Sequence, residues 1–146
     1  MKVSAKGKYA VQLMVDIVLH NTGSCVALKD VSRRQNISVK YLEQVVGSLT
    51  ACGFLKGSRG PQGGYRLMPG VEKKTVGDVL RAVEGGAGHL QAQEENGAER
   101  VFDDGGQAVN RMWANLYVVI NNYLDSITLE DIAQESAGSA QDDFII

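Results

Sequence analysis

The chain has 146 residues and a mass of 15.7 kDa, which allows one domain, or a small domain with an oligomerisation element, and excludes most large enzyme architectures. Hydrophobic residues make up 44% and charged residues 22%, as expected for a folded globular protein. The net charge of −2 hides an asymmetry, because the residues before Met68 sum to +7 and the rest to −9. This split indicates a basic nucleic-acid-binding module joined to an acidic segment, with chance clustering on solvated helix faces as the alternative.

Neither a membrane segment nor a metal site is predicted. The longest apolar runs fall short of the ~18 residues of a spanning helix, and residues 1–8 lack the apolar core of a signal peptide. We therefore expect a cytoplasmic protein with no membrane partner. The two cysteines, Cys25 and Cys52, are too few for a disulfide scaffold and are not spaced as a metal-ligand pair, so no metal and no cofactor are expected.

Three helices are predicted in the first part of the chain. Apolar residues at three-and-four spacing indicate a helix over residues 6–20, and a loop follows over residues 21–24. A shorter helix fits residues 28–35, and a third begins after Ser38 as N-cap and ends at Gly53. The third helix has an apolar stripe that includes Tyr41 and Cys52, and an outward face with small and polar residues: Val39, Lys40, Glu43, Gln44, Gly47 and Ser48.

A hairpin follows the third helix. Two helices joined by a tight turn are typical of a helix-turn-helix, and residues 54–67 read as strand, glycine-rich turn and strand. The expected fold class is therefore mainly α with a small β-hairpin, a winged helix-turn-helix. Arg59 lies at the predicted tip of the wing, where its guanidinium fits the negative potential of a DNA minor groove.

The rest of the chain is predicted to form a dimerisation element. A short helix over residues 75–84 begins with Thr75 as a possible cap and completes a DNA-binding domain of residues 1–84; residues 85–106 are expected to form a flexible loop. Residues 107–135 then hold a long helix and a short one, followed by a tail at 136–146. The long helix carries an apolar stripe that we expect to pair with a second chain, or alternatively to fold onto its own domain: Val109, Met112, Trp113, Leu116, Val119, Ile120 and Tyr123.

An enzyme is the competing class, and the sequence does not favour it. The glycine-rich segments at residues 60–64 and 85–88 match neither nucleotide-binding glycine motif, and neither lies between a strand and a helix of a βαβ unit. No set of nucleophile and base is evident. A protein-interaction adaptor that has lost DNA binding is a third class, against which the intact basic segment with Arg59 argues.

Two motifs carry a family resemblance. Residues 38–45 (SVKYLEQV) together with residues 57–65 (GSRGPQGGY) closely resemble the Rrf2 family of bacterial winged-helix regulators. Residues 6–10, 76–80 and 129–132 also look like family landmarks, so the resemblance covers nearly the whole chain. It implies a transcriptional regulator, with repression as the expected outcome, that binds a two-fold operator in double-stranded DNA as a homodimer through the long helix.

By that resemblance, six residues match DNA-contacting positions: Ser38, Lys40, Tyr41, Glu43, Gln44 and Arg59. Gln44 can pair with adenine, and Glu43 can accept from cytosine N4, pair with Lys40 or exclude wrong bases. Lys40 can neutralise a phosphate, and the hydroxyl of Ser38 can reach one. For Tyr41 a core ring with an exposed hydroxyl is an equal alternative to a phosphate contact.

The chain departs from the family pattern after the wing. Cluster-binding members carry three cysteines there, whereas residues 85–106 contain none and offer only His89 as a soft ligand. The chain therefore looks most like the CymR-type repressors of cysteine and sulfur metabolism, without an iron–sulfur cluster. The alternatives are a cluster held by His89 and carboxylates, or the same dimer sensing redox, iron–sulfur or nitric oxide status, with Cys25 as a reactive or an inert loop thiol.

The last residues suggest how a signal could be sensed. Phe144, Ile145 and Ile146 resemble the C-terminal isoleucine peptide by which serine acetyltransferase docks into O-acetylserine thiol-lyase, and CymR-type regulators form a complex with that enzyme. The resemblance implies that O-acetylserine competes for the same site. The alternative is that these residues pack on the protein's own long helix.

Overall fold

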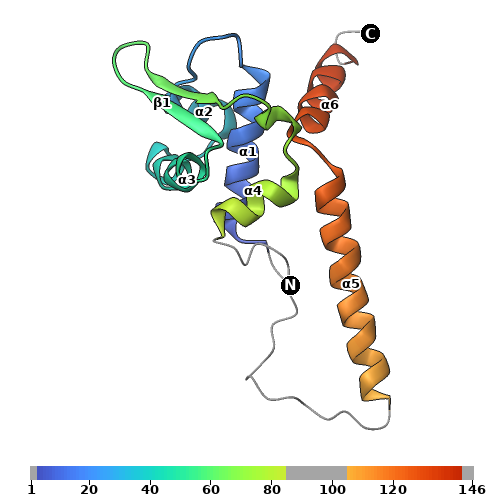
Figure 1. Cartoon of the computed structure of the whole chain (residues 1–146). Helices are drawn as coiled ribbons and strands as arrows, with labels where there is room; N and C mark the ends of the chain where they lie inside the picture. Colours follow the sequence, from blue (N-terminus) through green and yellow to red (C-terminus); the bar gives the residue numbers. More distant parts are fainter. Residues whose placement is uncertain (1–2, 85–104, 143–146) are drawn as a thin grey trace.

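The computed structural model describes residues 3–84 and 105–142 (Figure 1). Its elements in chain order are α1 (Ala5–Leu19), α2 (Leu28–Gln35), α3 (Val39–Ala51), β1 (Leu55–Ser58), β2 (Gly64–Leu67), the 3-10 helix η1 (Val71–Lys73), α4 (Val76–Val83), α5 (Gly106–Ser126) and α6 (Leu129–Asp142). This mainly helical chain with one two-stranded hairpin confirms the predicted fold class. Figure 1 shows α1 to α4 and the hairpin gathered together, while α5 runs away from them as one long helix.

The core forms around α1. Its side chains Leu13, Met14 and Ile17 are buried and pack with the inner faces of α2, α3 and α4. Helix α6 also packs on α1, with Leu129 fully buried in the same core. Residues 3–84, which we call the head, therefore share their core with the start of α6.

The turn between α2 and α3 is set by two caps. Asn36 ends α2 in the left-handed conformation at φ 56°, which an asparagine adopts more readily than most residues. Ser38 then caps α3, since its hydroxyl accepts a hydrogen bond from the backbone N–H of Tyr41 at 3.2 Å. The tight connection predicted from the sequence is confirmed by these caps.

The C-terminal end of α3 corrects one expectation. Gly53, at φ 78°, donates to the carbonyl of Thr50, and Phe54 donates to that of Leu49, which is the glycine stop that the sequence predicts. Cys52, expected on the buried stripe, is exposed, and its Sγ lies 3.5 Å from the carbonyl oxygen of Ala82. Helix α3 ends at Ala51, so Cys52 lies outside the helix. The helical periodicity that predicted a buried position for it therefore does not apply.

The hairpin is tied to the loop after α1. Its strands pair from Leu55 opposite Leu67 to Ser58 opposite Gly64. Val26 extends this pairing by exchanging two backbone hydrogen bonds of 2.8 Å with Tyr65. Gly64 permits the approach, because a Cβ at this position would overlap the carbonyl group of Val26. The wing is thus fixed to the body of the head at its base.

The last elements differ in part from the prediction. Helix α6 continues to Asp142, so the expected tail from residue 136 begins as helix. The second half of α6 is rich in serine, glycine and glutamine and has little apolar periodicity, so the sequence pattern does not predict a helix there. Most of the expected loop at 85–106, with His89, lies outside the described residues, as do Phe144, Ile145 and Ile146. In the described ranges, no helix combines the length and the apolar character that crossing a membrane requires.

Candidate nucleic-acid interface

Helix α3 presents a polar face on the surface of the head. Leu42, Val45 and Leu49 are buried, which turns the opposite side of the helix toward solvent. That side, which we call the outer face of α3, consists of four exposed residues that recur at intervals of three and four: Lys40, Glu43, Gln44 and Gly47. The structure therefore brings three of the predicted DNA-contacting residues onto one surface.

Tyr41 lies at the edge of that surface. It is partly buried, and its ring meets the ring of Tyr9 edge to face with centroids 4.9 Å apart. The ring thus packs against the core, as the alternative for this residue anticipates. A phosphate contact by its hydroxyl remains a prediction. Ser38 is exposed, with its hydroxyl engaged in capping α3.

Arg59 lies beyond the end of β1, at the tip of the hairpin, and is exposed. The turn around it is tight: the N–H of Gly63 donates to the carbonyl of Gly60 at 2.8 Å, and Gly60 has φ 105°. A side chain on Gly63 would overlap the carbonyl oxygen of Ser58, so the narrow tip depends on glycine. Such a projecting, cationic tip has the form that a groove of DNA accepts.

Two further basic residues on the hairpin were not singled out from the sequence. Lys56 in β1 and Arg66 in β2 are both exposed and belong to the same stem that carries Arg59. Their positive charge adds to that of Arg59 on the hairpin. The sequence places each of these residues inside a predicted strand. That they lie opposite each other follows only from the pairing register of the two strands.

Helix α2 is anchored by a buried carboxylate. Asp16 of α1 is fully buried and accepts hydrogen bonds from Arg34 Nη2 at 2.7 Å, Arg34 Nε at 3.0 Å and Gln35 Nε2 at 3.0 Å. Burial acts to raise the pKa of Asp16, but the hydrogen bonds from Arg34 and Gln35 and the charge of Arg34 outweigh it and hold the pKa below its usual value. The carboxylate therefore stays ionised and fixes α2, the helix before α3, to the core.

The long helix supplies a second surface. No residue of α5 is buried, and five residues of the predicted stripe are exposed, including Trp113 at 48% and Tyr123 at 64%. Leu116 and Ile120 are partly buried. The described part of one chain therefore leaves most of this stripe uncovered.

Comparison with known proteins identifies the fold and the activity. The pattern of the Rrf2 family, described as "Iron-dependent Transcriptional regulator", matches residues 3–135. The chain belongs to the Rrf2 family of transcriptional regulators. It is 35% identical over 138 residues to the HTH-type transcriptional regulator IscR of Vibrio vulnificus (strain YJ016), covering 93% of this chain and 79% of that protein.

Solved structures of Rrf2-like regulators share the fold. CymR of B. subtilis, described as the global cysteine regulator, is 31% identical with a TM-score of 0.77, over 92% of this chain and 98% of that one. IscR of T. potens is 34% identical with a TM-score of 0.72, over 93% and 88%. The oxidized form of Staphylococcus aureus CymR is 30% identical with a TM-score of 0.73, over 91% and 96%. The winged-helix class is confirmed, and these relatives are named regulators rather than enzymes.

The family description raises the question of iron. Iron–sulfur clusters are held mainly by thiolates, and the sequence offers only Cys25 and Cys52. Cys25 lies in the loop after α1, whereas Cys52 caps the end of α3 beside α4. Within residues 3–84 and 105–142, no group of three potential metal ligands comes together. The donor set of this Rrf2 protein therefore does not fit a cluster held by three cysteines.

Proposed function

We propose that this Rrf2 regulator binds a two-fold operator as a homodimer held together by α5. The observation that carries the proposal is the uncovered stripe of α5, because exposed apolar patches on soluble proteins mark interaction surfaces. A second copy presents the same stripe, and self-complementary pairing of this kind closes as a two-fold dimer. Such a dimer places two α3 helices and two wings against half-sites related by its own symmetry.

The dimer is tested by sedimentation of two matched variants. Trp113→Lys puts a charge in the stripe and should give a monomer that binds the operator at least tenfold more weakly. Val118→Lys puts the same charge at a 56% exposed position on the other side of α5 and should remain a dimer. Monomers from both variants, or from neither, would overturn the assignment of this stripe.

Within the head, we assign Lys40, Ser38 and the Tyr41 hydroxyl to phosphates, Glu43 and Gln44 to base edges, and Arg59 to the minor groove. Lys40→Ala should reduce the slope of log affinity against log salt by about one unit, since one phosphate contact is lost. Arg59→Ala should weaken binding and alter the preference for the bases under the wing. Lys73→Ala, an exposed lysine of η1 beside α6, is the control and should change neither property.

We further propose that the regulated process is cysteine and sulfur metabolism, with repression as the outcome. The support is the likeness to the B. subtilis global cysteine regulator over 92% of this chain, together with the donor set that does not fit a cluster. The proposed partner is O-acetylserine thiol-lyase, and the proposed contact segment is Phe144, Ile145 and Ile146.

Calorimetric titration of that enzyme tests the partner. The intact protein should bind, and the variant lacking Ile145 and Ile146 should not, while O-acetylserine should compete with the intact protein. Both forms should bind operator DNA equally, which shows that the deletion leaves the head folded. Equal binding of the two forms to the enzyme, or none, would overturn this partner.

A redox response is the second candidate, and one contact favours it. Cys25 is partly buried and directly precedes Val26, which is hydrogen-bonded to Tyr65 of the wing. Hydrogen peroxide would convert the Cys25 thiol to a sulfenic acid with release of water, and a larger polar group there would disturb the wing. Peroxide should then weaken operator binding by wild type and by Cys52→Ser. Operator binding by Cys25→Ser should be the same with and without peroxide. Equal sensitivity of all three proteins would exclude Cys25 as the sensor.

A further inference from the structure

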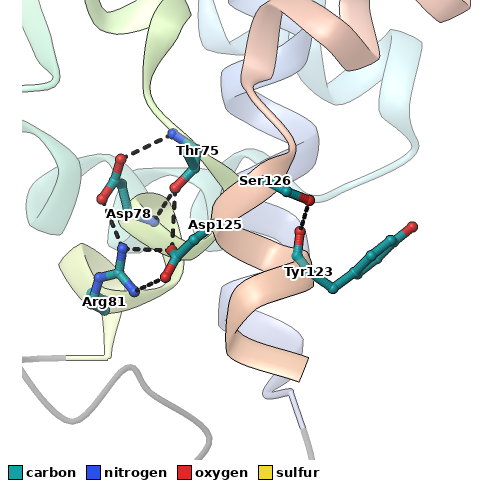
Figure 2. A network of polar contacts seen from close by, with 6 residues as sticks. All are labelled: Thr75, Asp78, Arg81, Tyr123, Asp125 and Ser126. Atoms are coloured by element: carbon teal, nitrogen blue, oxygen red, sulfur yellow. Dashed lines mark hydrogen bonds and ion pairs between the residues drawn. The ribbon is translucent and has the colours of Figure 1, made fainter. Parts of the chain in front are cut away.

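One arginine links the head to the long helix (Figure 2). Arg81 of α4 places Nη2 at 2.8 Å from Asp78 Oδ1 and at 2.7 Å from Asp125 Oδ1, and Nη1 at 3.4 Å from Asp125 Oδ2. Asp78 belongs to α4 itself, where it completes a capping box with Thr75. Asp125 lies at the C-terminal end of α5. The guanidinium therefore joins two carboxylates, one from the head and one from α5.

The backbone around this ion pair is held closely. The N–H of Val76 donates to the carbonyl of Ile127, and the N–H of Leu129 donates to that of Lys74, both at 2.9 Å. A Cβ at Gly77 would overlap the carboxylate of Asp125, so a side chain at this position would displace Asp125 from its place beside Arg81. Among the described elements, α4 is the part of the head on which α5 mainly packs. This small joint therefore defines the direction in which α5 leaves the head.

A small change at the joint has a large effect at a distance. Helix α5 has 21 residues, which at ~1.5 Å per residue give a length of about 30 Å. Rotation by about 10° at one end displaces the other by about 5 Å. One base pair along DNA is ~3.4 Å, so a displacement of about 5 Å at the far end of α5 is larger than one base-pair step. A change in the direction of α5 at the joint would therefore be large enough to matter for the half-site spacing that a dimer fits.

We propose that the Arg81–Asp125 ion pair fixes the angle between the head and α5 and thereby selects the spacing between the half-sites of the operator. The proposal rests on the homodimer proposed above, in which the two heads are related through α5. Arg81 and Asp125 are positioning residues, since they act on the arrangement of the heads and not on DNA. The neighbouring Tyr123, whose carbonyl accepts from Ser126 at 2.6 Å, belongs to the stripe, and its side chain points away from Arg81 and Asp125 (Figure 2). The joint and the proposed dimer surface therefore lie on different sides of α5.

The test measures affinity against spacing. Wild-type protein first selects a consensus from random duplexes, and that consensus is then rebuilt with its half-sites one or two base pairs closer or farther apart. Wild type should prefer one spacing over its neighbours by on the order of tenfold, the cost of deforming DNA or protein to fit. Asp125→Asn should reduce this preference to about threefold or less, with unchanged affinity for a duplex that carries a single half-site.

Asp131→Asn is the matched control. It removes one negative charge close to the same joint, where Asp131 accepts from the N–H of Thr128 at 2.9 Å and caps α6. This variant should keep the wild-type spacing preference. Arg81→Met, Asp125→Asn and the double variant should each lose the spacing preference to the same extent, because the two residues act as a unit.

Two outcomes separate this proposal from the homodimer proposal. If Asp125→Asn keeps the wild-type preference, or if Asp131→Asn loses it equally, Arg81 and Asp125 do not set the spacing. If sedimentation shows that wild type is a monomer both free and on DNA, the homodimer itself is wrong. A wild-type dimer that binds all spacings equally would overturn the spacing role alone.

Discussion

Lys56 and Arg66 lie directly opposite each other on the two strands of the wing, and both are exposed. Like charges at opposite positions of an antiparallel pair destabilise the hairpin. The arrangement is readily understood if both side chains contact the phosphates of DNA, because a bound anion offsets their repulsion.

Lys56→Gln is therefore expected to have opposite effects on folding and on binding. Relief of the repulsion should raise the stability of the protein by about 0.5 kcal/mol, and loss of a phosphate contact should lower the salt slope of operator binding by about one unit. Urea unfolding and DNA titration at several salt concentrations measure the two effects. Lys73→Gln, outside the hairpin, should leave the salt slope unchanged. An unchanged slope for Lys56→Gln would show that the strands of the wing do not contact the phosphates of DNA.

Gly47 on the outer face of α3 provides a second pair of opposed effects. A Cβ at Gly47 meets no atom within 4 Å, so nothing in the described structure requires glycine there. Gly47→Ala should stabilise the protein by about 0.5–1 kcal/mol through helix propensity. Operator affinity should fall about tenfold or more, since an added methyl group in a closely packed interface costs ~1–3 kcal/mol.

Gly138→Ala is the control for Gly47. Gly138 lies in α6, and a Cβ added there would also meet no atom within 4 Å, so alanine should stabilise the helix without affecting DNA binding. Thermal unfolding and operator titration of both variants provide the comparison. Operator affinity that is equal for Gly47→Ala and wild type would show that DNA does not approach this part of α3.

Arg34 and Arg33 are adjacent but should differ greatly in their importance. Arg34→Met leaves the buried Asp16 without its charge partner and should cost about 3 kcal/mol of stability. Arg33 is 75% exposed and pairs with Asp30 on the surface, so Arg33→Met should change stability by less than about 0.5 kcal/mol. The double variant Asp16→Leu with Arg34→Met should recover much of the stability that Arg34→Met loses, as measured by urea unfolding. Similar losses for both single variants would contradict the anchoring role of Asp16.

Acid should destabilise the head through the same carboxylate. The pKa of Asp16 is lower in the folded protein than its ordinary value of 3.8, so its contribution is complete above that value and is lost as pH falls toward the folded-state pKa. Asp78 acts in the same direction: burial raises its pKa, but hydrogen bonds from Thr75 and Arg81 lower it by more. Between about pH 5 and pH 2, Asp16→Asn should lose less unfolding free energy than wild type does. An identical pH dependence for the two proteins would exclude Asp16 as the titrating group.

Local residue patterns were enough to predict the individual helices, their caps and the hairpin. The caps at Ser38 and Thr75, the glycine stop at Gly53 and the glycine-rich tip beside Arg59 could be predicted, because each depends on residues within a few positions of one another. The outer face of α3 followed from helical periodicity for the same reason.

The contacts between side chains that are distant in the sequence could not be predicted and follow from the packing of the helices. Asp16 and Arg34 are 18 positions apart, and Arg81 and Asp125 are 44 apart, and no local pattern connects such pairs. The exposure of Cys52 depended on where α3 ends, and the opposition of Lys56 and Arg66 depended on the strand register. Short-range hydrogen bonding and side-chain periodicity specify elements, whereas the packing of those elements sets the contacts between them.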